Sequence, residues 1–142
     1  MTGKVVIDTS CLVRAALRPD SVPDQAVTLA LSGFQLCASS EALHELEVVL
    51  QRQRFNSYVS ITSRNAFIAS IRSHAQIFTL TDSARSDLKE CCRDENDEFI
   101  LALALAAEAD VIVSSDHDLL ALHPWRGIPI VTPAQFVAQF SR

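Results

Sequence analysis

The 142-residue sequence has little of what marks several other classes of protein. Only three glycines, five prolines and no low-complexity run exclude disorder over most of the length. The longest apolar run, Phe99 to Ala107, has nine residues. That is well short of the roughly 18–20 residues that span a bilayer. Near the N-terminus the acid Asp8 follows only three apolar residues, so we expect no signal peptide, no membrane span and a cytoplasmic protein.

Basic residues and metal-type cysteine pairs are also scarce. Seventeen acids against twelve bases give a net charge of −5. Proteins that bind nucleic acids are usually basic, so the total argues against that class unless basic residues gather locally. No CxxC pair occurs, and Cys91 and Cys92 are adjacent, which does not suit a zinc site. We interpret the four cysteines as buried or helix-surface thiols in a reducing compartment.

What is present suits one globular domain, which we expect to cover residues 1–142. Short runs rich in β-branched residues alternate with segments of helical periodicity. We expect strands at residues 4–7, 34–38, 76–80, 111–113 and 128–131. Strands so short and uniformly apolar are covered on both faces. The predicted fold class is therefore α/β, a three-layer α/β/α sandwich around a mainly parallel sheet of about five strands.

Helices are expected between the strands, and no element is assigned to the polar residues 81–93. We expect helices at residues 11–17, 24–31, 40–51, within 55–74, and at 97–108, 117–122 and 133–140. Residues 97–108 are apolar on nearly all sides, which predicts a central helix. Within 55–74 we expect four residues to face inward: Ile61, Phe67, Ile68 and Ile71.

Acidic residues gather where the expected strands end. Asp8 follows the first strand, and Asp116 and Asp118 follow the fourth. Glu45 lies on the helix after the second strand, and Asp97 begins the central helix. Ligands of open α/β sheets bind at the carboxyl ends of the strands. Crowded carboxylates repel one another unless a divalent cation such as Mg²⁺ or Mn²⁺ binds among them, and such a site suits phosphodiester hydrolysis.

Each acid also has a purely structural interpretation. Asp8, Asp116 and Asp118 could be helix N-caps, and Asp97 could be a first-turn acid that complements the helix dipole. Acids such as Glu41 could be solvated charges on a helix face. The convergence of several acids on one edge of the sheet favours the metal site.

Four motifs, in this order, resemble the PIN domain family over nearly the whole chain. They are the strand Val-Val-Ile-Asp8-Thr9-Ser10, the helix with Glu45 in an E-x-E-x-x-L stretch, a D-x-x-D segment ending at Asp97, and Ala-Asp-Val-Ile-Val-Ser-Ser-Asp116-His-Asp118-Leu-Leu. Asp94 is a secondary candidate in the third motif, and Ser115 stands where glycine is common. The resemblance implies the α/β/α fold and a divalent-metal-dependent ribonuclease. In small bacterial members of the family this ribonuclease is the toxin component of a toxin–antitoxin pair (VapC-like). An antitoxin protein inhibits it, and family members often form homodimers.

The resemblance also assigns residues. It implies four catalytic acids: Asp8, Glu45, Asp97 and Asp116. It also implies a site for Mg²⁺ or Mn²⁺, which Asp8, Asp97 and Asp116 bind most directly. Asp118 would be a further ligand or would support the site. Glu45 would bind a second ion or orient the water. Thr9 or Ser10 would orient Asp8 or bond a substrate phosphate.

RNA binding by an acidic protein needs local cations. Arg14 and Arg18 follow Asp8, and Arg52 and Arg54 follow Glu45; of these we select Arg14 and Arg52 as substrate-binding candidates. The aromatic residues Phe55, Tyr58 and Trp125 could stack on bases or pack in the core.

Two other functions stay open. One is a non-catalytic PIN-like module that binds RNA or protein. The other is a Mg²⁺-dependent phosphohydrolase or a phosphorelay receiver. The phosphohydrolase pattern would require an Asp at Ser10, which weakens it. The receiver would require an acceptor Asp after a strand in mid-chain, where none is found.

Overall fold

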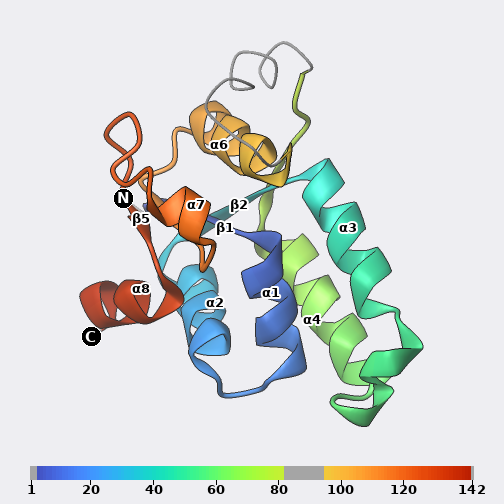
Figure 1. Ribbon diagram of the computed structural model, residues 1–142. Coiled ribbons are helices and arrows are strands. Elements are labelled where there is room, and N and C mark those ends of the chain that lie inside the picture. The colour runs from blue at the N-terminus through green and yellow to red at the C-terminus, as the bar shows by residue number, and fades with distance from the viewer. Residues whose placement is uncertain (1–2, 82–94, 142) are drawn as a thin grey trace.

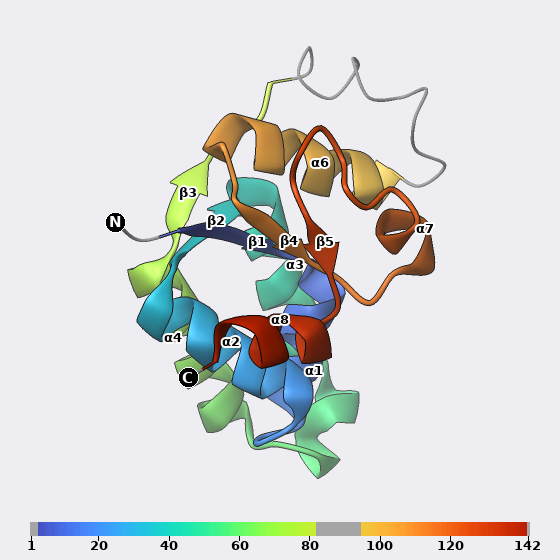
Figure 2. The same cartoon turned by 90° about the vertical axis from the view of Figure 1, so that its left-hand side faces the viewer.

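A computed structural model describes residues 3–81 and 95–141. Five parallel strands form one sheet: β1 (Lys4–Ile7), β2 (Gln35–Ser39), β3 (Gln76–Phe78), β4 (Val111–Val113) and β5 (Ile130–Val131). Their order is β3-β2-β1-β4-β5, so β1 is central; β1 and β2 are labelled side by side in Figure 1, and all five strands are labelled in Figure 2. Ile7 pairs with Val113, which places the residues that follow β1 and β4 side by side at the carboxyl edge.

The helices connect these parallel strands and begin where strands or loops supply a capping side chain. They are α1 (Thr9–Leu17), α2 (Val22–Gly33), α3 (Ser40–Leu50), the 3-10 helix η1 (Gln53–Ser57), α4 (Ile61–His74), α6 (Glu95–Ala107), α7 (His117–Leu120) and α8 (Pro133–Phe140). Asp8, Ser39 and Asp116 follow strands and cap α1, α3 and α7. Each accepts a hydrogen bond from a backbone N–H in the first turn of its helix, which satisfies a donor that the helix leaves free.

The sheet is buried on both faces (Figure 2). Val5 and Ile7 of β1 pack in the core formed with α1 to α4 and α8. Val6, between them, points to the opposite face and packs in a second core under α6. Alternate residues of one strand therefore enter two cores. The predicted three-layer α/β/α sandwich with a parallel sheet of five strands is confirmed. No helix in residues 3–81 or 95–141 has the length and hydropathy needed to cross a membrane.

The expectation that Ile61 faces inward is wrong. Ile61 is 41% exposed at the first position of α4, whereas Ile68 and Ile71 are buried as expected. The residue that continues their buried face toward the helix start is Arg64, which is 0% exposed. Arg64 donates hydrogen bonds to backbone carbonyl oxygens there, which an apolar residue could not do. Helical periodicity of apolar residues could not identify a buried arginine.

Candidate active site

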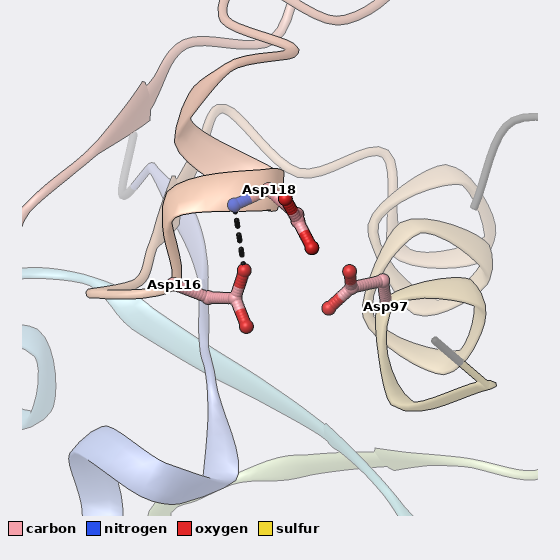
Figure 3. Close-up of side chains that lie close together, drawn as sticks. All are labelled: Asp97, Asp116 and Asp118. Carbon is pink, nitrogen blue, oxygen red and sulfur yellow. Dashed lines mark hydrogen bonds between the residues drawn. The ribbon is translucent and has the colours of Figure 1, made fainter. Parts of the chain in front are cut away.

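Three aspartates lie together at the carboxyl edge of the sheet. One carboxylate oxygen from each of Asp97, Asp116 and Asp118 lies within 4.8 Å of the other two. Asp97 comes from the first turn of α6, and the other two come from the start of α7 (Figure 3). Asp97 is 5% exposed, whereas Asp118 is exposed. We call these three residues the aspartate cluster.

The backbone of α7 orients one side of this cluster. Asp116 Oδ1 accepts hydrogen bonds from the backbone N–H groups of Asp118 at 2.8 Å and of Leu119 at 3.3 Å (Figure 3). Asp116 is therefore the N-cap, and the alternative that Asp118 caps this helix is wrong. The capping role of Asp116 uses only one of its two oxygens. Capping and metal binding are consequently compatible in the same residue.

Asp8 is joined to this cluster through Ser114. The hydroxyl of Ser114 donates to Asp8 Oδ2 at 2.9 Å and accepts from the backbone N–H of Asp116 at 3.0 Å. Asp8 Oδ1 accepts from the backbone N–H of Ser10 at 3.3 Å, which is its capping contact. Ser114 is 0% exposed, so both of its hydrogen bonds are shielded from water. This one hydroxyl fixes Asp8 and the start of the Asp116 loop relative to each other.

Ser114 is not among the site residues that were predicted from the sequence. Its signal is the strand register: because Ile7 pairs with Val113, the next residues, Asp8 and Ser114, must be neighbours. The sequence alone suggests two adjacent strands but does not fix their register. A small hydroxyl residue directly after an apolar strand was the only local indication.

A cavity of about 410 Å³ opens beside Asp8. Its polar wall comes from the ends of β1 and β2 and from α1 and α3: Asp8, Thr9, Ser10, Arg14, Ser39, Glu41 and Glu45. Phe99, Ile100 and Leu103 of α6 form the apolar side. We call this space the acidic cavity. It is bounded by α1, α3 and α6, and Asp8 and Asp97 lie at the starts of α1 and α6.

The predicted site residues thus fall into separate groups. Asp97, Asp116 and Asp118 form the cluster, whereas Asp8 and Glu45 line the acidic cavity and are not members of the cluster. Thr9, Ser10 and Arg14 also line the cavity. Arg52 instead precedes η1 and lines neither this cavity nor the adjacent cavity lined by Arg18. Asp94 lies outside the described residues.

The sulfur atoms near the site are poor candidates for metal binding. Cys11 Sγ lies 3.7 Å from the Ser115 hydroxyl. Burial raises the pKa of the Cys11 thiol, and the negative charge of Asp8 raises that pKa further. A thiol with a raised pKa stays protonated at neutral pH and offers no thiolate. Cys11 and Cys37 are free and buried, as expected, while Cys91 and Cys92 lie outside the described residues.

The donor set fits a small divalent cation. Mg²⁺ takes six oxygen ligands at about 2.1 Å, so opposite ligand oxygens lie about 4.2 Å apart. The 4.8 Å spread of the aspartate cluster is close to this span. Asp118 is exposed, so a rotation of its side chain can close the difference. All three donors are carboxylate oxygens, which suit Mg²⁺ and Mn²⁺.

Comparisons with known proteins agree with this arrangement. The sequence model of the family described as "PIN domain" matches residues 4–118, a range that contains every acid discussed above. A search of curated proteins finds no match.

Three solved structures have a similar fold. PAE2754 from Pyrobaculum aerophilum is 15% identical with a TM-score of 0.67, over 98% of this chain and 98% of that chain. VapBC2 from Rickettsia felis, bound to a DNA fragment from their promoter, is 14% identical with a TM-score of 0.62, over 91% and 98%. VapC20 from Mycobacterium tuberculosis, a sarcin–ricin loop cleaving toxin, is 17% identical with a TM-score of 0.59, over 84% and 95%. At these identities the similarity concerns the fold.

Proposed function

The chain belongs to the PIN domain family, and on this premise we propose that it is a divalent-metal-dependent endoribonuclease. The observation that carries the proposal is the aspartate cluster, in which three carboxylate oxygens from α6 and α7 lie within 4.8 Å of one another. Without a cation, the repulsion between three close carboxylates would destabilise this arrangement. With one, the same carboxylates become its ligands.

In this proposal Asp97, Asp116 and Asp118 hold Mg²⁺ or Mn²⁺. The bound ion would polarise the scissile phosphoryl group and lower the pKa of a water molecule that attacks it. Asp8 either completes the ligand set or accepts a proton, and Ser114 keeps its Oδ2 oriented. Glu45, which lines the acidic cavity with Asp8, orients the attacking water or contributes to a second ion.

The acidic cavity would receive the reacting part of the RNA. Thr9 and Ser10 lie at the start of α1, where their side-chain hydroxyls can donate to a phosphate oxygen. Arg14, one turn further along α1, adds a positive charge to an otherwise acidic wall. These groups would position the phosphate, since phosphoryl transfer depends mainly on positioning and electrostatic stabilisation.

We further propose that the chain is the toxin component of a toxin–antitoxin pair. Two of the similar structures, VapBC2 and VapC20, support this proposal, and VapC20 is described as a toxin that cleaves the sarcin–ricin loop. The proposal includes RNA as the substrate, a cognate antitoxin protein as the inhibitor, and a homodimer as the active assembly. We place the protein in the cytoplasm, where both RNA and the antitoxin would be available.

The test is cleavage of a mixed pool of single-stranded RNA by the purified chain with Mg²⁺, with Mn²⁺ and with EDTA. We expect cleavage with either metal and none with EDTA. The variant Asp97→Asn loses one ligand charge and should cleave at least about 100-fold more slowly. Glu108→Gln is the matched control, because Glu108 is exposed just beyond the opposite end of α6.

The outcomes separate the proposed nuclease from its alternatives. Equal activity of Asp97→Asn and the wild-type chain would contradict the assigned site. RNA binding without cleavage under any metal condition would favour the non-catalytic binding module. Hydrolysis of small phosphate esters with intact RNA would favour the phosphohydrolase.

A further inference from the structure

A second cavity, of about 520 Å³, lies next to the acidic cavity along α1. Its wall includes Arg14 of α1, Arg18 directly after that helix, and Phe55 and Tyr58 from the segment around η1. We call it the arginine cavity. Arg14 lines both cavities, so the two spaces are neighbours along one helix.

The cations around the arginine cavity are available for a ligand. Arg14 and Arg18 are exposed and one helical turn apart, and within the described residues neither has a carboxylate at salt-bridge distance. Arg54, at η1, does not line the cavity, but its guanidinium lies over the ring of Phe55, which does. By contrast, Arg72 forms an ion pair with Glu47. In a chain of net charge −5, this is a local concentration of positive charge.

Two aromatic rings complete the wall. Tyr58 is 69% exposed, and its ring centroid lies 6.5 Å from that of Phe55 at an interplanar angle of 55°. The Arg54 guanidinium lies 4.9 Å from the centroid of the Phe55 ring. A largely exposed tyrosine ring makes little use of its apolar face within the chain. Nucleobases stack on such rings with little preference for sequence.

A buried arginine holds this platform in place. Arg64 Nη1 donates to the carbonyl oxygens of Leu50 at 2.8 Å and Arg52 at 2.9 Å, and Nη2 donates to Asn56 Oδ1. Leu50 ends α3, where the helix dipole is negative and favours a cation. Arg64 thereby joins α3, the residue before η1 and η1 itself. The exposed Tyr58 and the half-buried Phe55 are consequently carried by a segment that Arg64 fixes, which lowers the ordering cost of binding.

We propose that the arginine cavity binds the single-stranded RNA that continues from the scissile phosphate. One nucleobase stacks on Tyr58 and Phe55, and Arg14 and Arg18 contact the flanking phosphates. The inference rests on the proposed function, because the strand is placed by its continuity with the acidic cavity. The free guanidinium groups favour a polyanion over an apolar protein surface.

The experiment measures RNA binding separately from cleavage. A fluorescently labelled, mixed-sequence single-stranded oligoribonucleotide is titrated with the full chain in EDTA, and its anisotropy gives Kd. We expect Tyr58→Ala to raise Kd about tenfold and Tyr58→Phe to leave it within about twofold. Arg18→Gln should weaken binding and reduce the slope of log Kd against log salt by about 0.7.

Matched controls separate this cavity from general charge effects. Arg126→Gln removes the same charge from an exposed arginine beside Trp125, on the segment between β4 and β5, and should leave Kd unchanged. Tyr58 is exposed, so the thermal unfolding midpoint of Tyr58→Ala should match that of the wild-type chain. A DNA oligonucleotide of the same sequence tests whether stacking and phosphate contacts suffice, or whether the 2′-hydroxyl contributes to affinity.

Cleavage with Mn²⁺ is measured on the same variants. A higher KM with an unchanged kcat in Tyr58→Ala supports the inference. If the wild-type chain cleaves RNA and Tyr58→Ala has the same Kd and KM, the inference is wrong and the nuclease stands. If Tyr58→Ala weakens RNA binding but no condition yields cleavage, the subsite stands and the nuclease is wrong. Altered self-association in sedimentation with unchanged RNA affinity would assign the surface to a protein contact instead.

Discussion

The acidic cavity and the arginine cavity lie side by side along α1 but carry opposite charge. Asp8 caps the start of this nine-residue helix, and Arg14 lies in its last turn. The helix dipole favours an acid at the first position and a base at the last, so one short segment stabilises both. The comparison shows that a net charge of −5 describes the whole chain and not its surfaces. An acidic protein can separate groups that hold a cation from groups that hold a polyanion.

A buried polar residue also holds together the segments that line each cavity. Ser114, which is 0% exposed, links Asp8 to the Asp116 loop. Arg64, also 0% exposed, links α3 to η1. The difference lies in what each holds: Ser114 orients a carboxylate directly, whereas Arg64 supports backbone that carries other side chains. Removal of the Ser114 hydroxyl should therefore lower the rate of cleavage, whereas removal of the Arg64 guanidinium should lower the free energy of unfolding.

The largest difference is expected for Arg64→Met. This change keeps an unbranched side chain but leaves the buried carbonyl oxygen of Leu50 and the partly buried carbonyl oxygen of Arg52 without this donor. We expect the free energy of unfolding to fall by about 2–3 kcal/mol, measured by urea denaturation. Arg72→Met is the matched control; it breaks a partly exposed ion pair and should cost less than about 1 kcal/mol. Equal losses in the two variants would contradict the role of Arg64.

Ser114→Ala should act on the acidic cavity alone. Loss of the hydroxyl frees Asp8 Oδ2 and removes the acceptor for the Asp116 N–H. We expect kcat for RNA cleavage to fall about 10- to 100-fold and the Mn²⁺ concentration for half-maximal activity to rise. RNA affinity in EDTA should not change. Ser114→Thr retains the hydroxyl and should recover much of the activity; if Ser114→Thr is as impaired as Ser114→Ala, the hydroxyl is not the cause.

Arg14→Gln should have the smallest effect and should reach both cavities, because Arg14 lines both. Loss of one exposed phosphate contact should weaken RNA binding about threefold at moderate salt. The effect should shrink as the salt concentration rises, which binding titrations at several salt concentrations would measure. A loss of affinity that does not depend on salt would indicate that Arg14 acts through packing and would argue against the shared wall.

The parallel α/β sandwich could be predicted from the sequence because the signals for its strands, helices and caps are local. Apolar strands, capping residues and helical periodicity are each readable within a few neighbours, and the bounds of β1, β4 and α8 agree with the expected ranges. Element ends elsewhere shift by a few residues, because side-chain caps decide them. That the chain is a single domain over residues 1–142 stays a prediction.

The site could be predicted only in part, because it depends on long-range placement. The sequence indicated that Asp97, Asp116 and Asp118 belong to one edge, and the structure brings them together. It could not determine that Glu45 lines the acidic cavity and is not a member of the cluster, since this depends on how α3 packs. The contributions of Ser114 and Arg64 depend on strand register and on a buried hydrogen-bond network, which no local pattern reveals.

The most direct test of the central claim is calorimetric titration of the chain with Mn²⁺. We expect saturable binding to the wild-type chain and to Glu108→Gln, and a loss of at least about tenfold in affinity in Asp97→Asn. Mn²⁺ affinity that is equal in all three proteins would contradict the claim that the aspartate cluster holds the metal.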